Sequence, residues 1–491
     1  MRDAGRGRCD AAVRMSGWSP AISRSVPRRY LVLAICCMSL FIVGLDNTIV
    51  NIALPALRRD LDASTSGLQW ILDAYTLVLA SLLVLAGSTA DRIGRRRIFQ
   101  TGLALFTVGS LLCSVAPSLG WLIAFRMVQA VGGSMLNPVA MSIITNTFTD
   151  PRERARAIGV WGGVVGFSMA AGPLFGGLLV DSLSWRSIFW LNVPVGITAF
   201  LLAARFIPES RAPHARRLDP VGQVLVLLVL ATTTYGIIEG PVAGWTSYEI
   251  VGCFVAGAVC LSALIANESR RTEPLLELRF FRSAPFSGAT VIAVCAFAAL
   301  GGFLFLNTIY LQDVRGLSAL HAGLYTLPMA AMTVLFAPLS GRMVGARGTR
   351  LPLLLAGGAF VLGILPLTRL TADTPGWQLI ACYLVFGFGF SMVNSPITNT
   401  AVSGMPKEQA GVAAAIASTS RQVGGALGVA VIGAVVSAST GGPDFIQASH
   451  AGWWIIAALG AVILLLGIVT TGRWAQATTE RVAANQALAP S

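Results

Sequence analysis

Residues 30–51 read YLVLAICCMSLFIVGLDNTIVN, an apolar stretch with a single charged side chain, Asp46. A helix needs about 20 mostly apolar residues to cross the hydrocarbon core of a bilayer. Inside lipid a chain must also satisfy its own backbone hydrogen bonds, and a helix does so within one segment. The stretch therefore predicts a membrane-spanning helix that carries one acid into the bilayer.

Similar apolar runs fill most of the 491 residues. Hydrophobic residues make up 55% of the chain and charged residues 12%, against about 25% charged residues in soluble proteins. The mean hydropathy is +0.72. We expect an all-α integral membrane protein of fourteen transmembrane helices, which excludes an ordinary soluble enzyme. The helices after the first are expected at residues 67–87, 98–116, 120–146, 157–180, 186–206, 220–240, 248–266, 284–311, 321–344, 351–369, 377–402, 411–438 and 451–472.

The net charge of +13 is better explained by the orientation of the chain in a membrane than by binding to nucleic acid. With a cytoplasmic N-terminus, 28 of the 35 Lys and Arg residues fall on the inner side and five on the outer side. Basic residues concentrate in the cytoplasmic loops of membrane proteins. We therefore expect a multi-pass protein of the cytoplasmic membrane with both termini in the cytoplasm and no nucleic-acid partner.

An internal repeat divides the chain. The sequence SMLNP at residues 134–138 recurs as SMVNSP at 391–396, and PRERA at 151–155 recurs as PKEQA at 406–410. The first six helices thus correspond to the last six, and helices seven and eight form an inserted hairpin. Repeats of this kind place the transport path between the two halves. The expected parts are a cytoplasmic Arg-rich tail (1–29), an N-terminal six-helix bundle (30–206), a linker with two extra helices (207–283), a C-terminal six-helix bundle (284–472) and a cytoplasmic tail (473–491).

Asp46 and Arg126 are the charges expected inside the first bundle. At 1.5 Å per residue, Asp46 lies roughly 13 Å and Arg126 roughly 9 Å from the outer end of its helix, so the two share a similar depth. An ionisable residue inside a membrane is a functional candidate by default. Burial and a nearby cation act in opposite directions on the proton affinity of a carboxylate, so a conformational change can load or release a proton. A static ion pair is the alternative, and proton coupling is the favoured interpretation.

The segment after the second helix, GSTADRIGRRR at residues 87–97, places one acid among four bases on the cytoplasmic side. The plain interpretation is a charge cluster that sets topology. The alternative is a cytoplasmic gate in which Asp91 pairs with bases such as Arg154 when the inner side is closed. Topology alone would not require an acid, which favours the gate. Its expected members are Gly87, Asp91, Arg92, Gly94, Arg95 and Arg154.

The fifth helix carries Gly172, Pro173, Gly176 and Gly177. Small residues on one face let another helix approach closely, and proline removes a backbone donor and bends a helix. The combination favours a moving seam between the two halves over packing alone.

Polar residues within the other spans are candidates for lining the transport path, although each is more often a partner in an interhelical hydrogen bond. For Arg421, attraction of an anionic group and a structural counter-ion role are weighed equally. These candidates are Asn47, Asn51, Asp73, Tyr75, Gln129, Asn137, Asn394, Arg421 and Gln422.

These motifs resemble those of the major facilitator superfamily, specifically its fourteen-helix drug:proton antiporters. Residues 45–55 are similar to L-D-x-T-x-V-N-x-A-L-P, residues 87–97 to G-x-L-A-D-R-x-G-R-R/K, residues 126–132 to R-x-x-Q-G-x-G, and residues 172–177 to the antiporter element G-P-x-x-G-G.

The resemblance implies proton coupling by Asp46 and Arg126 and a cytoplasmic gate formed by Asp91, Arg92 and Arg95. In the second half, Gly345 stands where Asp91 would align, so any second gate is weaker.

We therefore predict a proton-coupled antiporter that exports amphipathic drugs or antibiotics across the cytoplasmic membrane by alternating access. A proton-coupled metabolite symporter and, less favoured, a non-transporting membrane sensor are the alternatives. The chain has no Walker A pattern and no metal-ligand spacing of its three His residues. We expect no enzymatic activity, no cofactor and no metal, with the proton gradient as the driving force. The expected partners are an amphipathic small molecule, protons and the bilayer, and the expected state is a monomer.

Overall fold

The computed structural model describes residues 26–212, 219–271, 278–402, 410–437 and 442–472, with a few more between 474 and 481. Fourteen helical stretches of these residues are long and apolar enough to cross a membrane, which confirms the predicted fold class. The elements are α1 (Val26–Leu61), α2 (Thr65–Ile93), α3 (Arg95–Ser114), α4 (Leu119–Thr147), α5 (Pro151–Ser182), α6 (Ser187–Trp190), α7 (Asn192–Phe206), α8 (Pro220–Ala243), α9 (Tyr248–Arg270), η1 (Leu278–Arg282), α10 (Ala284–Ile309), η2 (Tyr310–Val314), α11 (Ala319–Arg347), α12 (Arg350–Ile364), η3 (Leu365–Arg369), α13 (Gly376–Val402), α14 (Ala410–Val436) and α15 (Gly442–Val469).

Several helices run past their predicted limits because hydropathy marks only the part of a helix that lies in lipid. The first helix continues from residue 51 to Leu61 and includes Pro55. The second continues to Ile93, so residues 87–93 are helical rather than a loop, and the chain turns at Gly94 with φ +134°. α5 begins at Pro151, where the Asp150 carboxylate accepts hydrogen bonds from two backbone amides.

The predicted single helix over residues 186–206 is interrupted. It consists of the short α6 and the longer α7, which join at Leu191. Pro194 lacks a backbone N–H, so the hydrogen bond that would tie it to the preceding turn is missing. Asn192, the first residue of α7, is fully buried.

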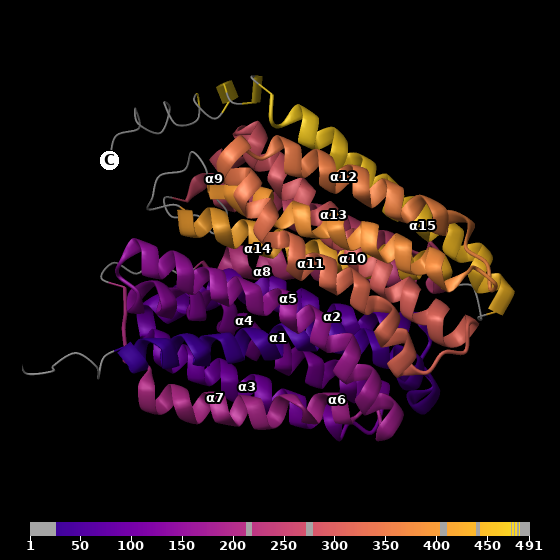
Figure 1. The fold of residues 1–491 in the computed structure, drawn as a ribbon, viewed down its shortest axis with the longest axis horizontal. Helices are drawn as coiled ribbons and strands as arrows, with labels where there is room; N and C mark the ends of the chain where they lie inside the picture. The colour runs from indigo at the N-terminus through magenta and orange to yellow at the C-terminus, as the bar shows by residue number, and fades with distance from the viewer. Residues whose placement is uncertain are drawn as a thin grey trace, which may run out of the picture.

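The helices form two groups that lie side by side, α1–α7 in one and α10–α15 in the other (Figure 1). The groups meet along two helix pairs, α5 with α11 and α2 with α14. α8 contacts both α2 and α14 at the boundary between the groups, and α9 packs against α8. We call the end that carries the α2–α3 turn at Gly94 the basic end, and the end that carries the α1–α2 turn at residues 62–64 the opposite end.

Candidate functional site

Asp46 and Arg126 meet inside the first helix group. Arg126 Nη1 donates a hydrogen bond to Asp46 Oδ2, and the side chains of Asp46 and Arg126 are 0% and 1% exposed. Two amides donate to the other carboxylate oxygen, Gln129 Nε2 at 2.9 Å and Asn192 Nδ2 at 3.2 Å. Asp46 therefore accepts hydrogen bonds from two helices besides its own, α4 and α7.

Arg126 is held by groups other than the acid. Its Nη1 also donates to Gln129 Oε1 at 2.8 Å, and its guanidinium carbon lies 4.1 Å from the centre of the Tyr75 ring. A guanidinium over an aromatic face gains a cation–π attraction that strengthens when water is excluded. Arg126 is thus oriented by a fixed frame of side chains, and Asp46 supplies the balancing negative charge.

Apolar side chains close this pair off on both sides. Toward the basic end lie Ile42 and Leu136, and toward the opposite end lie Ile49 and Leu122, all buried. An ionised carboxylate in such a place is costly unless it is paired and hydrogen-bonded. In this conformation the Asp46 side chain has no exposed surface.

The surroundings of this pair include residues that the sequence analysis missed. Asn192 contacts Ser110 Oγ at 3.1 Å as well as Asp46, and the Cys113 thiol lies 3.9 Å from Gln129 Oε1. The signal that could have pointed to Asn192 is a polar residue two positions before a proline inside an apolar run.

The gate acid, near the end of α2, contacts the first residue of α3 across the turn at Gly94. Asp91 Oδ1 accepts from Arg95 Nε at 3.0 Å and lies 2.8 Å from its Nη2, four residues along the chain. Arg154 lies in the first turn of α5, and no ion pair joins it to Asp91 within the described residues. Arg92 is exposed, and a Cβ on Gly87 would find only Pro138, at 3.7 Å. The predicted contact between Asp91 and Arg154 is therefore not made in this conformation.

Glu209, which was not predicted, holds the gate turn instead. Its carboxylate accepts from the backbone N–H of Arg96 at 3.1 Å and lies 3.7 Å from the Arg97 guanidinium. A Cβ on Gly94 would lie 2.6 Å from a Glu209 oxygen, so the missing side chain gives the acid its place at the start of α3. A carboxylate is stabilised by the N-terminus of a helix. Residues 209–212 are thereby fastened to the turn, with Ser210 O accepting from Arg95 N at 2.9 Å.

The glycines of α5 allow close helix contacts at the opposite end. A Cβ on Gly177 would lie 2.5 Å from Leu320 Cα of α11, and a Cβ on Gly176 would lie 2.8 Å from the Ile49 side chain of α1. Gly172 is packed just as tightly against Thr48, and Gly323 of α11 against the carbonyl of Pro173. Gly177 and Gly323 thus close the seam between the two groups, whereas Gly172 and Gly176 pack α5 against α1 within the first group.

The same face of α5 is open nearer the basic end. Gly166 would bring a Cβ within 3.1 Å of Val334, but Gly159, Gly162 and Gly163 would meet nothing within 4 Å. Residues three and four apart share one face of a helix. The α5–α11 seam is therefore closed from about Gly166 toward the opposite end and open toward the basic end.

Polar contacts lock the opposite end. The Asp181 carboxylate of α5 accepts from the first two backbone amides of α11, Ala319 N at 3.0 Å and Leu320 N at 2.8 Å. Arg58 lies 3.3 Å from Asp313, which follows α10. Between α2 and α14, the other helix pair that joins the two groups, Gln69 Nε2 donates to the carbonyl of Ala430 at 2.8 Å.

The remaining cavity candidates lie in different surroundings. Asp73 is fully buried, and no described residue provides a hydrogen bond to either of its carboxylate oxygens. Arg421 Nη2 donates to Thr398 Oγ1 at 2.5 Å, which ties α14 to α13.

Of the amides, Asn51 donates to the carbonyl of Asn47 on its own helix at 3.1 Å. Asn137, Asn394 and Gln422 are half-buried. Only Tyr75 and Gln129 of the candidate set join the Asp46 cluster. In the described residues, no group of His, Cys, Asp and Glu could hold a metal ion.

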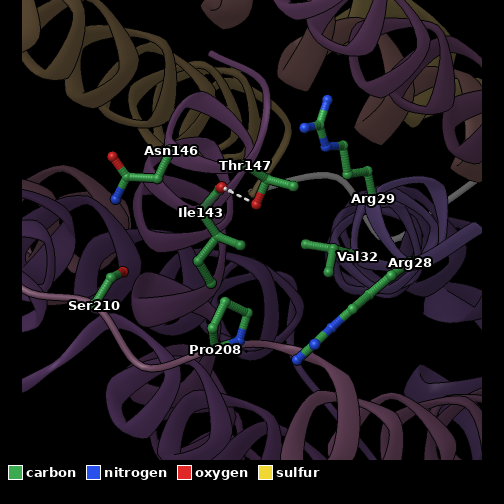
Figure 2. Close-up of a pocket in the computed structure, with 8 residues that line it drawn as sticks. All are labelled: Arg28, Arg29, Val32, Ile143, Asn146, Thr147, Pro208 and Ser210. Atoms are coloured by element: carbon green, nitrogen blue, oxygen red, sulfur yellow. Dashed lines mark hydrogen bonds between the residues drawn. The ribbon is translucent and has the colours of Figure 1, made fainter. Parts of the chain in front are cut away.

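A pocket of about 660 Å³ lies at the basic end of the first group (Figure 2). Its walls come from the start of α1, the end of α4 and the segment after α7. The lining residues are Arg28, Arg29, Val32, Ile143, Asn146, Thr147, Pro208 and Ser210.

Two helix groups that touch closely at one end of their seam and stand apart at the other, with a buried ion pair inside the first group, define a membrane transporter. The model of the Major Facilitator Superfamily matches residues 36–429, and the chain belongs to that family. The chain is 36% identical over 408 residues to the multidrug resistance protein Stp of Mycobacterium tuberculosis, covering 83% of this chain and 76% of Stp. It is 36% identical over 416 residues to the tetracenomycin C resistance and export protein of Streptomyces glaucescens, covering 84% and 77%.

Solved structures agree on the fold. The crystal structure of a D-xylose–proton symporter superimposes with a TM-score of 0.65 at 14% identity, covering 90% of this chain and 97% of the symporter. A bacterial homologue of the lysosomal transporter Spinster, titled as inward-facing and unoccupied, gives a TM-score of 0.61 at 17% identity, covering 95% and 99%.

Proposed function

We propose that this protein is a proton-coupled antiporter that exports amphipathic drugs or antibiotics from the cytoplasm. The Asp46–Arg126 pair carries the proposal, because Asp46 is a buried acid of the first bundle whose charge is balanced by one cation, Arg126. The relatives named for multidrug resistance and for tetracenomycin C export support an exporter. A low-identity likeness to a symporter bears only on the fold.

The distribution of bases supports an orientation with the basic end in the cytoplasm. In that orientation both termini are cytoplasmic, and the structure is open to the inside and closed to the outside. The moving bodies are the bundles over residues 30–206 and 284–472, and the hairpin within 207–283 follows the boundary between them.

The coupling step follows from charge balance. When Asp46 takes up a proton it becomes neutral and stops balancing Arg126, so the guanidinium must shift toward other acceptors. Because Asp46, Gln129 and Asn192 join helices α1, α4 and α7, a change at the acid alters how these helices pack. The pair is sealed in the present state, so loading and release of the proton belong to different conformations. The exporter would thus draw its energy from the proton gradient and need no cofactor.

An efflux assay tests the proposal. Asp46→Asn keeps the size and polarity of the side chain but cannot ionise. We expect the variant to reach the membrane of an efflux-deficient host and to lose efflux that a protonophore abolishes in the wild type. Asp62→Asn is the matched control, because Asp62 lies in an exposed turn with φ +49°, a conformation that asparagine accepts. Efflux retained by Asp46→Asn would remove the acid from the coupling role.

A further inference from the structure

We propose that the pocket at the basic end of the first bundle binds the phosphate group of an anionic phospholipid from the cytoplasmic leaflet. The inference rests on the orientation proposed above. Figure 2 shows Arg28 reaching toward Pro208 across the pocket, with Val32 and Ile143 facing each other in its centre. A basic pocket between transmembrane helices on the cytoplasmic side is suited to an anionic lipid headgroup.

The two arginines supply available positive charge. No described acid lies within ion-pair distance of Arg28, and Arg29 lies 3.4 Å from Glu153 with both of those side chains about half exposed. An exposed pair of this kind contributes little to stability, so Arg29 can exchange its acid for a stronger partner. Guanidinium groups bind phosphate through paired hydrogen bonds.

The floor of the pocket favours a lipid over a free anion. Val32 and Ile143 are 2% and 3% exposed, and Pro208 adds a third apolar surface beside the charges. Pro208 is exposed, and a free phosphate would leave its ring in contact with water. A phospholipid places its phosphate on the arginines and its glycerol and upper acyl groups on the apolar side chains, with Asn146 and Ser210 at the rim as neutral hydrogen-bond partners.

The position of the pocket connects the lipid to the gate turn. Pro208 and Ser210 belong to the segment that Glu209 fastens to the start of α3, where Ser210 O accepts from Arg95 N. A lipid that joins this segment to α1 and α4 would hold the gate turn in the arrangement seen here. The site is separate from the Asp46 pair, which lies about 27 Å along α1 from Arg28 at 1.5 Å per residue.

Binding of phosphatidylglycerol to the delipidated full-length protein in detergent tests this inference independently of transport. Native mass spectrometry measures the bound lipid, with phosphatidylcholine, whose phosphate is balanced by a choline cation, as the zwitterionic reference. We expect phosphatidylglycerol to bind more tightly than phosphatidylcholine, and Arg28→Gln with Arg29→Gln to weaken it roughly 30-fold, at about one tenfold step per 1.4 kcal/mol. Arg347→Gln with Arg350→Gln removes two exposed bases from the same end of the second bundle and should leave the affinity unchanged.

Two further measurements separate the pocket from general surface charge. Asn146→Trp fills the pocket from an exposed position and keeps both arginines, so it should also weaken phosphatidylglycerol binding. Unchanged binding by Asn146→Trp, or equal losses in the Arg28/Arg29 and Arg347/Arg350 variants, would overturn the site. Displacement of the lipid by an equal concentration of inorganic phosphate would overturn the assignment to a lipid. Each readout is a binding constant, so loss of proton coupling elsewhere would not affect it.

Discussion

At the scale of single residues, the stability of the Asp46–Arg126 pair depends on each charge balancing the other. Removing one partner of a buried ion pair leaves the other charge without compensation, which costs about 3–5 kcal/mol, whereas replacing both can be nearly neutral. We therefore expect Arg126→Leu to lower the thermal unfolding midpoint sharply, and Asp46→Asn combined with Arg126→Leu to recover most of the loss. Both variants should lack proton-driven efflux. Thermal unfolding of the purified proteins in one detergent measures the cycle.

The double variant also separates the two interpretations of the pair. If the pair only held the bundle together, restored stability would bring restored efflux. A double variant that is as unstable as Arg126→Leu alone would instead contradict the charge-balance argument, because the loss would then come from packing.

The similar depth of these two charges follows from the sequence, since depth along two antiparallel helices can be counted in residues. The hydrogen bonds from Gln129 and Asn192 do not follow from it, because they depend on how α4 and α7 rotate about their axes. Glu209 was missed for a related reason. It lies beyond the end of a helix, where no periodicity assigns a partner, and its role depends on the open space above Gly94.

At the scale of helices, the seam between α5 and α11 depends on the absence of side chains. A methyl group on Gly177 would press on the backbone of α11 at Leu320 Cα, which cannot rotate away as a side chain can. Overpacking of this kind costs about 1–3 kcal/mol. We expect Gly177→Ala to destabilise the closed opposite end and to slow efflux, measured by drug accumulation and thermal unfolding.

Gly252→Ala is the control for that substitution. Gly252 lies in α9, away from the seam, and a Cβ there meets nothing within 4 Å. It should leave both measurements unchanged. Equal behaviour of the two variants would mean that close approach at Gly177 has no part in transport.

Helix identity was predictable because fourteen apolar runs are long and regular, but helix ends were not. α2 extends through residues 87–93 because Ala90 and its charged neighbours are accommodated in a helix that has already left the lipid. As a consequence, Asp91 lies on the last turn of α2, where it pairs with Arg95, and not on a loop that could reach α5.

At the scale of the whole molecule, the polar contacts described between the two bundles lie toward the opposite end, where Asp181 caps α11 and Arg58 faces Asp313. If the bundles rock as bodies, weakening that end must open it and close the basic end in the same molecules. We expect Asp181→Ala with Arg58→Ala to produce this reciprocal change. Spin labels at residues 154 and 347 should move closer together, and labels at residues 183 and 318 should move farther apart. Asp60→Ala is the matched control, because Asp60 pairs with Arg186 at the same end but within one bundle, so it should change neither distance. A change at one end alone would contradict rigid rocking, because the seam would then open by local bending of α5 at Pro173 without a response from the other end.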